Sequence, residues 1–142
     1  MSDNVLFDDI SLMFDDLFID REYEDFNEAL DDLVSKYKLY GVNINVTGLL
    51  SSDKEKSLVL FEIIRESVTN AINHAGSKNI NVFINESSFD YEMIINNDGV
   101  KPKKKIVEGE GIKGMKRKVY SLGGVIDISS RDGFVLKVRI KK

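Results

Sequence analysis

The chain of 142 residues contains no cysteine, a single histidine and a single proline. Without cysteine it can form neither a disulfide framework nor a thiolate zinc site, and it has no cysteine nucleophile. One histidine cannot build a histidine-rich metal site, so any bound cation is expected to be a hard ion with oxygen ligands. No apolar run reaches the roughly 18–20 residues of a membrane span, and no basic-then-apolar signal segment opens the chain. We therefore expect a cytoplasmic protein, with no membrane contact by this chain.

Charge is distributed unevenly along the sequence. Residues 1–32 hold twelve of the 24 acidic side chains, whereas residues 101–142 hold thirteen of the 20 basic ones. A basic segment can bind nucleic acid, but the aromatic residues do not alternate with its lysines as they do in single-strand binders. Lysines near Gly109 would equally screen the charge of a triphosphate. We therefore expect no nucleic-acid partner.

Hydrophobic periodicity predicts helices and strands that alternate along one domain. The apolar fraction of 42%, with eight Phe and five Tyr, is enough for a real core. Because hairpins join most of the strands, we predict an α/β two-layer sandwich whose mixed, mostly antiparallel sheet is covered on one face by helices. The helices are predicted at 22–40, 54–75 and 112–122, and the strands at 42–46, 79–85, 89–96, 125–129 and 134–140. Residues 1–21 are interpreted as an acidic N-terminal arm or helix that precedes a domain of residues 22–142.

The long helix predicted at 54–75 carries a polar stripe beside its packing surface. Glu66, Asn70 and His74 are four residues apart and share one helix face. A solvated face is the alternative, but Thr-Asn and Asn-His in the middle of a helix lower its propensity without improving solubility. A cation that bridges phosphates would use the amide oxygen of Asn70. The packing surface is predicted to consist of Leu58, Leu60, Phe61, Ile64, Val68, Ala71, Ile72 and Ala75, and the stripe of Glu62, Glu66, Thr69, Asn70 and Asn73.

A glycine pattern, Gly109, Gly111 and Gly114, precedes and enters the next predicted helix. Glycines at a helix start leave backbone N–H groups accessible to phosphate. Residues 100–108, which precede this pattern, are interpreted as a lid over the site. A flexible loop does not explain Gly114, because glycine inside a helix costs about 1 kcal/mol. With the Asn-Asp-Gly turn at 97–99, these motifs indicate a nucleotide site, with ATP and a divalent cation as the favoured ligands.

Three motifs resemble those of the GHKL ATPases, the group of gyrase, MutL and sensor histidine kinases. The run E-S-V-T-N-A-I-N-H-A at 66–75 resembles their N box, N-D-G at 97–99 their first glycine box, and G-E-G-I-K-G-M at 109–115 their second. The second glycine box is similar to that of kinases of the nitrate-sensor-like subclass. The resemblance covers about residues 26–141, with the motifs in the family's order and spacing.

The resemblance implies a Bergerat-type fold and a role for each motif. Glu66 would be the catalytic carboxylate that orients or deprotonates a water or acceptor near the γ-phosphate, and Asn70 would bind Mg²⁺. His74 would contact a phosphate or be structural; it is not expected to be the phosphoacceptor. Asn97 stands where relatives usually have an Asp that accepts from the adenine amino group. The ATP-binding residues implied are Asn70, Asn73, His74, Asn97, Asp98, Gly99, Lys105, Gly109, Gly111, Ile112, Lys113, Gly114 and Met115.

The function implied is that of the ATP-binding catalytic domain of a two-component sensor histidine kinase, at residues 22–142. It would supply Mg·ATP for phosphoryl transfer to a histidine on a separate segment. Its partners would be the phosphoacceptor and dimerisation domain of the same kinase and, indirectly, a response regulator. The isolated domain is expected to be a monomer that at most hydrolyses ATP slowly. Two alternatives stay open: a free-standing serine kinase of the anti-sigma type, and a nucleotide-gated interaction module that docks through the acidic residues 3–32.

Overall fold

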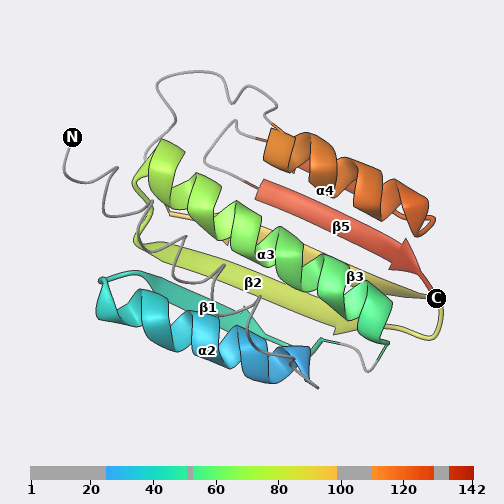
Figure 1. Cartoon of the computed structure of the whole chain (residues 1–142), viewed down its shortest axis with the longest axis horizontal. Coiled ribbons are helices and arrows are strands. Elements are labelled where there is room, and N and C mark those ends of the chain that lie inside the picture. Colours follow the sequence, from blue (N-terminus) through green and yellow to red (C-terminus); the bar gives the residue numbers. More distant parts are fainter. Residues whose placement is uncertain (1–24, 51–52, 99–109, 130–134) are drawn as a thin grey trace.

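The structure, a computed structural model, describes residues 25–50, 53–98, 110–129 and 135–142. The predicted N-terminal arm, the predicted lid and the turn at 131–133 lie outside these residues. The described elements, labelled as in Figure 1, are α2 (Phe26–Leu39), β1 (Asn43–Thr47), α3 (Lys54–Ala75), β2 (Asn79–Glu86), β3 (Asp90–Asn97), α4 (Glu110–Ser121), β4 (Val125–Ser129) and β5 (Val135–Lys141).

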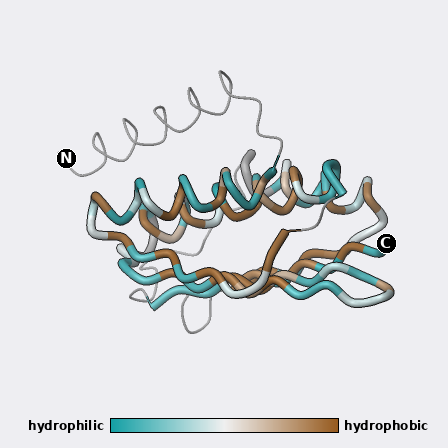
Figure 2. The backbone as a smooth tube through the Cα atoms, turned by 90° about the horizontal axis from the view of Figure 1, so that it is seen from below, coloured by the Kyte–Doolittle hydropathy of each residue, from teal (hydrophilic) through white to brown (hydrophobic). Residues whose placement is uncertain are grey.

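The strands form one five-stranded sheet in the order β1-β2-β3-β5-β4. β1 and β2 are parallel, and the other three pairs are antiparallel. The three described helices lie on the same side of the sheet, and no described element covers its other face, called the open face below (Figure 2). α2 packs against β1, α3 against β2 and β3, and α4 against β4. This arrangement confirms the predicted two-layer sandwich with a mixed, mostly antiparallel sheet.

The ends of α2 and α3 follow from capping residues. The Asp53 side chain accepts a hydrogen bond from the backbone N–H of Lys56 at 3.1 Å, and Gly76 ends α3 in the left-handed conformation with φ 58°. α3 therefore has the bounds that the sequence predicted. Asp25 caps α2 by accepting from the backbone N–H of Asn27 at 2.8 Å, so α2 begins at Phe26 and not at residue 22.

The buried side of α3 is rotated slightly from the predicted one. Val59 and Ile63 are buried, whereas Leu58, predicted to pack, is 42% exposed. The reason is helical periodicity: Leu58 precedes Glu62 by four residues and so lies in the row of the polar stripe. Ser57 and Ser67 are fully buried, which the sequence did not indicate.

The other differences are small shifts of element ends. α4 begins and ends earlier than the predicted 112–122, so that Gly111 lies inside its first turn. β1, β2, β3 and β5 each differ by one residue at one or both ends, and β4 has the predicted bounds. In the described part of the chain, no helix combines the length and apolarity that crossing a bilayer requires.

Candidate functional site

Most of the predicted site residues that the structure describes lie at one end of the molecule. β2 begins just after α3 ends, and β3 runs back beside β2, so that Asn97 pairs with Ile80 at the start of β2. The end of β3 therefore lies near the C-terminal end of α3, where Asn70 and Asn73 are (Figure 1). The topology thus brings the predicted N box and the first glycine box together, although Asn79, the first residue of β2, and Asp98 are 19 positions apart along the chain.

A pocket of about 240 Å³ lies between α3 and α4. Lys118 of α4 forms an ion pair with Glu62 of α3. One turn from this pair on each helix lie Glu66 and Gly114, so the two motifs face each other across the pocket. Its lining residues are Glu62, Ile63, Arg65, Glu66, Gly114, Met115 and Lys118.

The polar stripe of α3 divides into engaged and unengaged side chains. The Thr69 hydroxyl donates to the Arg65 carbonyl at 3.0 Å, and Glu62 is paired with Lys118. Glu66 and Asn70 are half-buried and make no hydrogen bond or ion pair within the described residues. Partly buried polar groups without partners cost free energy. The two side chains that are open to a ligand are therefore the carboxylate and carboxamide with predicted chemical roles.

Packing among the described residues does not require Gly114. Within this part of the chain, a Cβ atom added there would meet only the Nη2 atom of Arg117, at 4.0 Å, whereas one added at Gly124 would lie 2.6 Å from the Arg139 carbonyl oxygen. Gly124 is needed for the close approach of two backbone segments. Gly114 instead lies in the interior of α4, where glycine is unfavourable, and leaves space on the pocket wall. A ligand that approaches the helix backbone would explain its presence.

Asn97 and Asp98 point to opposite faces of the sheet. Asn97 follows the buried residues Met93 and Ile95 in the alternation of β3, so it belongs to the helix-covered face and is half-buried. The Asp98 carboxylate accepts hydrogen bonds from the backbone and side chain of Asn79, which keeps the pKa of Asp98 below its ordinary value. Asn97 is thus the better placed of the two to face a ligand under the helices.

The remaining predicted residues are only partly described. Lys113 is exposed in the first turn of α4, Met115 is buried and lines the pocket, and Asn73 is exposed on α3. His74, Gly111 and Ile112 lie in helices, but only their backbone is described. Gly99, Lys105 and Gly109 lie outside the described residues.

A divalent cation in this region would depend on few protein ligands. Among the described residues, no group of three or more His, Cys, Asp or Glu side chains could hold a metal ion. Asn70, one helical turn after the pocket residue Glu66, offers an amide oxygen that is unengaged within the described residues. This fits Mg²⁺, which in phosphate sites commonly takes one or two protein ligands and completes its shell with phosphate and water.

Two residues next to the site were missed by sequence reasoning. Lys118 forms the ion pair that joins α3 to α4, and Asn79 holds Asp98. The sequence does show that Lys118 follows Gly114 by one helical turn. It does not show that α3 and α4 pack together with Lys118 opposite Glu62.

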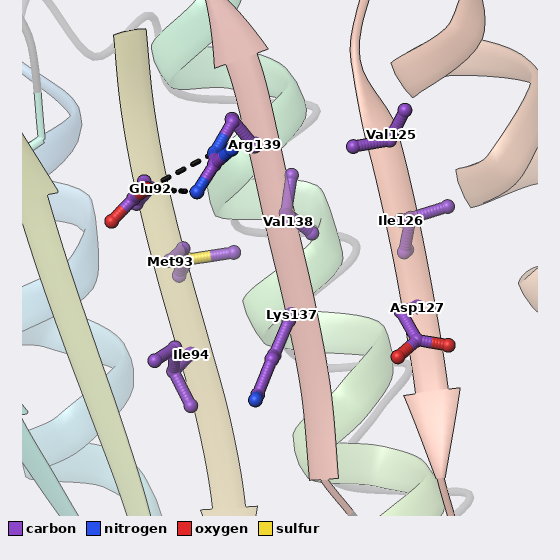
Figure 3. A pocket seen from close by; sticks show the side chains of 9 residues that line it. All are labelled: Glu92, Met93, Ile94, Val125, Ile126, Asp127, Lys137, Val138 and Arg139. Carbon is purple, nitrogen blue, oxygen red and sulfur yellow. Dashed lines mark hydrogen bonds and ion pairs between the residues drawn. The ribbon is translucent and has the colours of Figure 1, made fainter.

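A second pocket, of about 340 Å³, lies on the open face of the sheet over β3, β5 and β4 (Figure 3). Arg139 donates two hydrogen bonds to Glu92, at 2.6 and 3.0 Å, and the two side chains point toward each other. Lys137 and Asp127 are opposite each other in register but point apart. No predicted site residue lines this pocket. Its lining residues are Glu92, Met93, Ile94, Val125, Ile126, Asp127, Lys137, Val138 and Arg139.

Comparison with known proteins identifies the fold. No protein-family model matches the sequence, and no curated protein sequence matches it either. The structure is similar to the histidine kinase domain of the blue-light activated histidine kinase of Erythrobacter litoralis EL346, with a TM-score of 0.66 and 17% identity over 82% of this chain and 60% of that one. It is also similar to the histidine kinase AdeS of Acinetobacter baumannii (TM-score 0.61, 13% identity, 96% of this chain and 76% of that one).

A third similar structure is an ATP binding domain on its own, that of PrrB from Mycobacterium tuberculosis. The TM-score is 0.59 at 15% identity, and the match covers 82% of this chain and 93% of that one. This chain spans 60% of the Erythrobacter kinase domain and 52% of the longer Erythrobacter structure. It therefore has the fold of histidine kinase ATP-binding domains.

Proposed function

We propose that this chain is the catalytic, ATP-binding domain of a sensor histidine kinase of the nitrate-sensor-like subclass. Mg·ATP would bind under the helices, between α3, the start of α4 and the end of β3. The observation that carries the proposal is the pairing of two half-buried, unengaged side chains, Glu66 and Asn70, with the open wall at Gly114. Phosphates approach a backbone closely where a side chain is absent, and helix starts offer them N–H groups.

Each side chain has a role that its chemistry supports. The Asn97 amide would accept from the adenine amino group and donate to the neighbouring ring nitrogen. Asn70 would hold Mg²⁺, which neutralises phosphate charge when bound. The Glu66 carboxylate, one turn earlier on α3 and without a partner in the described part of the chain, would orient the acceptor imidazole or a water near the γ-phosphate and accept its proton. The phosphoryl group would pass to a histidine on a separate phosphoacceptor and dimerisation domain, and from there to a response regulator.

The melting temperature of the protein tests the proposal. A ligand at 100 times its Kd stabilises the native state by about 2.7 kcal/mol, which for a domain of this size raises the melting temperature by roughly 8 °C. We expect this shift with Mg·ATP and Mg·ADP, and a much smaller one with ATP in EDTA or with Mg²⁺ alone. A folded protein whose melting temperature does not move with millimolar Mg·ATP is not an ATP-binding domain.

A further inference from the structure

Directly after the end of β3, Asp98 adds a further connection to the start of β2 through Asn79. The backbone N–H of Asp98 donates to the Asn79 carbonyl at 3.1 Å. In return, the Asp98 carboxylate accepts from the Asn79 backbone N–H at 3.1 Å and from its side-chain Nδ2 at 2.7 Å. Three hydrogen bonds, two of them to a charged acceptor, therefore fix this point of the chain.

The Asn79 carboxamide is itself held on its other side. Asn43 of β1 donates from its Nδ2 atom to the Asn79 Oδ1 atom at 3.2 Å. Its oxygen and its nitrogen are both engaged, so the carboxamide has one favoured orientation, with its donor toward Asp98. A row of side chains thus crosses the open face from the edge strand β1 to the end of β3.

A second row of the same chemistry lies two residues further along the strands. Asn45 donates to Asn81 at 3.3 Å, and Asn81 donates to Asn96 at 3.0 Å. This row joins the same three strands but does not include Asp98. It provides a matched internal control for the first row.

The position of Asp98 matters because of its neighbour. Asn97 and Asp98 are consecutive in extended backbone, so their side chains point to opposite faces. Holding the Asp98 side chain on the open face fixes the backbone around Asn97 and so directs the Asn97 side chain under the helices. The Asp98 carboxylate itself is occupied on the face away from α3 and α4.

We propose that Asp98, held by Asn79, is a positioning residue that orients Asn97 toward the base of the bound nucleotide and does not itself contact the nucleotide. The inference rests on the proposed function and deepens it, because it assigns base recognition to Asn97 and a supporting role to a row of side chains on the far face of the sheet.

The substitution Asn79→Ala separates this role from direct contact. If Asp98 positions Asn97, losing the Asn79 side chain weakens binding of the base. If Asp98 binds the base directly, the same change frees its carboxylate, and affinity stays equal or rises. Asn81→Ala removes the equivalent carboxamide from the second row and serves as the control.

The experiment measures the affinities of Mg·ADP and of inorganic Mg·tripolyphosphate, which has no base, by calorimetric titration and competition. We expect Asp98→Ala to weaken the affinity for Mg·ADP about tenfold, the equivalent of about 1.4 kcal/mol. Asn79→Ala should weaken this affinity about threefold, which is about half of that free energy. Tripolyphosphate affinity stays at the wild-type level in both variants, and Asn81→Ala binds both ligands as the wild type does. Asp98→Asn, which still offers an oxygen to the Asn79 backbone, is expected to retain part of the affinity.

Two results would overturn the inference. One is wild-type or tighter Mg·ADP binding by Asn79→Ala together with a loss in Asp98→Ala, which makes Asp98 a direct ligand. The other is an equal loss of Mg·ADP and tripolyphosphate in the row variants, which makes the effect one of general structure. A wild-type protein that binds neither ligand would instead refute the proposed function itself.

Discussion

The open face of the sheet and the helix layer on its other side differ in how their polar side chains are paired. On the open face these side chains largely satisfy one another, as in the two asparagine rows and the Glu92–Arg139 pair. In the helix layer that covers the other face, Glu66 and Asn70 of α3 are half-buried and have no partner among the described residues. Unpaired polar groups in such places cost free energy unless a ligand engages them. We therefore propose that a ligand binds at the helix layer, whereas the polar side chains of the open face connect the strands to one another.

Pocket size alone would have given the opposite answer. The open-face pocket has about 340 Å³ and the pocket between α3 and α4 about 240 Å³. The larger one is lined by the exposed apolar side chains Ile94 and Val125 and by an ion pair that is already satisfied. The smaller one combines an unengaged carboxylate with a glycine that packing does not require. Chemistry, and not volume, distinguishes the two.

The largest expected effect comes from replacing the carboxylate on the helix-covered face. Glu66→Gln keeps the size of the side chain but removes its charge and its capacity to accept a proton. General acid–base groups contribute about 100-fold or more to a rate, so we expect ATP turnover to fall by at least that factor while Mg·ATP affinity stays near the wild-type value. The readout is steady-state phosphate release together with calorimetric titration.

Glu92→Gln is the matched change on the open face. Its partner Arg139 lies in an exposed pair, which contributes little to stability. Turnover in this variant should equal that of the wild type. Equal losses in the Glu66 and Glu92 variants would erase the distinction between the two faces.

Gly114 should show stability and binding moving in opposite directions. Gly114→Ala relieves an unfavourable helix position without a clash, so it should stabilise the fold by up to about 1 kcal/mol. Gly114→Leu should place side-chain atoms where phosphate approaches and weaken Mg·ATP binding about tenfold. Thermal unfolding and titration measure the two effects.

Gly124→Ala, in contrast, should destabilise the fold, because its Cβ would lie 2.6 Å from a carbonyl oxygen. Tight Mg·ATP binding by a stable Gly114→Leu protein would place the phosphates elsewhere.

A smaller effect is expected at Asn97. A carboxylate is a stronger acceptor than an amide, and an amide can serve either adenine or guanine by exchanging its O and N atoms. Asn97→Asp should therefore raise ATP affinity a few-fold and sharpen the preference for ATP over GTP in competition binding. Asn96→Asp, on the open face, should change neither, because the Asn96 side chain already accepts from Asn81. If the Asn97 variant discriminates no better than the wild type, Asn97 does not face the base.

The smallest effect concerns acid stability on the open face. The folded-state pKa of Asp98 is lowered from its ordinary value of 3.8, mainly because the Asn79 side chain donates to the carboxylate. A lowered carboxyl pKa contributes stability that is fully present above 3.8 and is lost as the pH falls through the folded-state value. The stability difference between wild type and Asp98→Asn, measured by urea unfolding, should therefore shrink from pH 5 to pH 3. A constant difference across that range would mean that the Asp98 charge does not contribute.

Local signals in the sequence were enough to predict most of the fold. The pattern of residues at 54–75 predicted the bounds of α3, which Asp53 and Gly76 cap in the structure, and the hairpins indicated the antiparallel pairs. Leu58 was predicted to lie on the buried face of α3 but is exposed. The sequence near Leu58 does not show from which direction the neighbouring elements pack against the helix. The bonds from Lys118 to Glu62 and from Asn79 to Asp98 join residues distant in sequence, so they could be found only in the folded structure.

The measurement that tests the central claim most directly is the same substitution on the two faces, Asn70→Ala beside Asn81→Ala, titrated with ATP in Mg²⁺ and in EDTA. The account predicts that Asn70→Ala loses Mg²⁺-dependent ATP binding, because the cation loses its protein ligand. It predicts that Asn81→Ala binds Mg·ATP like the wild type, because its carboxamide serves only the second asparagine row on the open face. Undiminished Mg·ATP binding by a folded Asn70→Ala protein, or an equal loss in both variants, would contradict the assignment of the nucleotide to the helix-covered face.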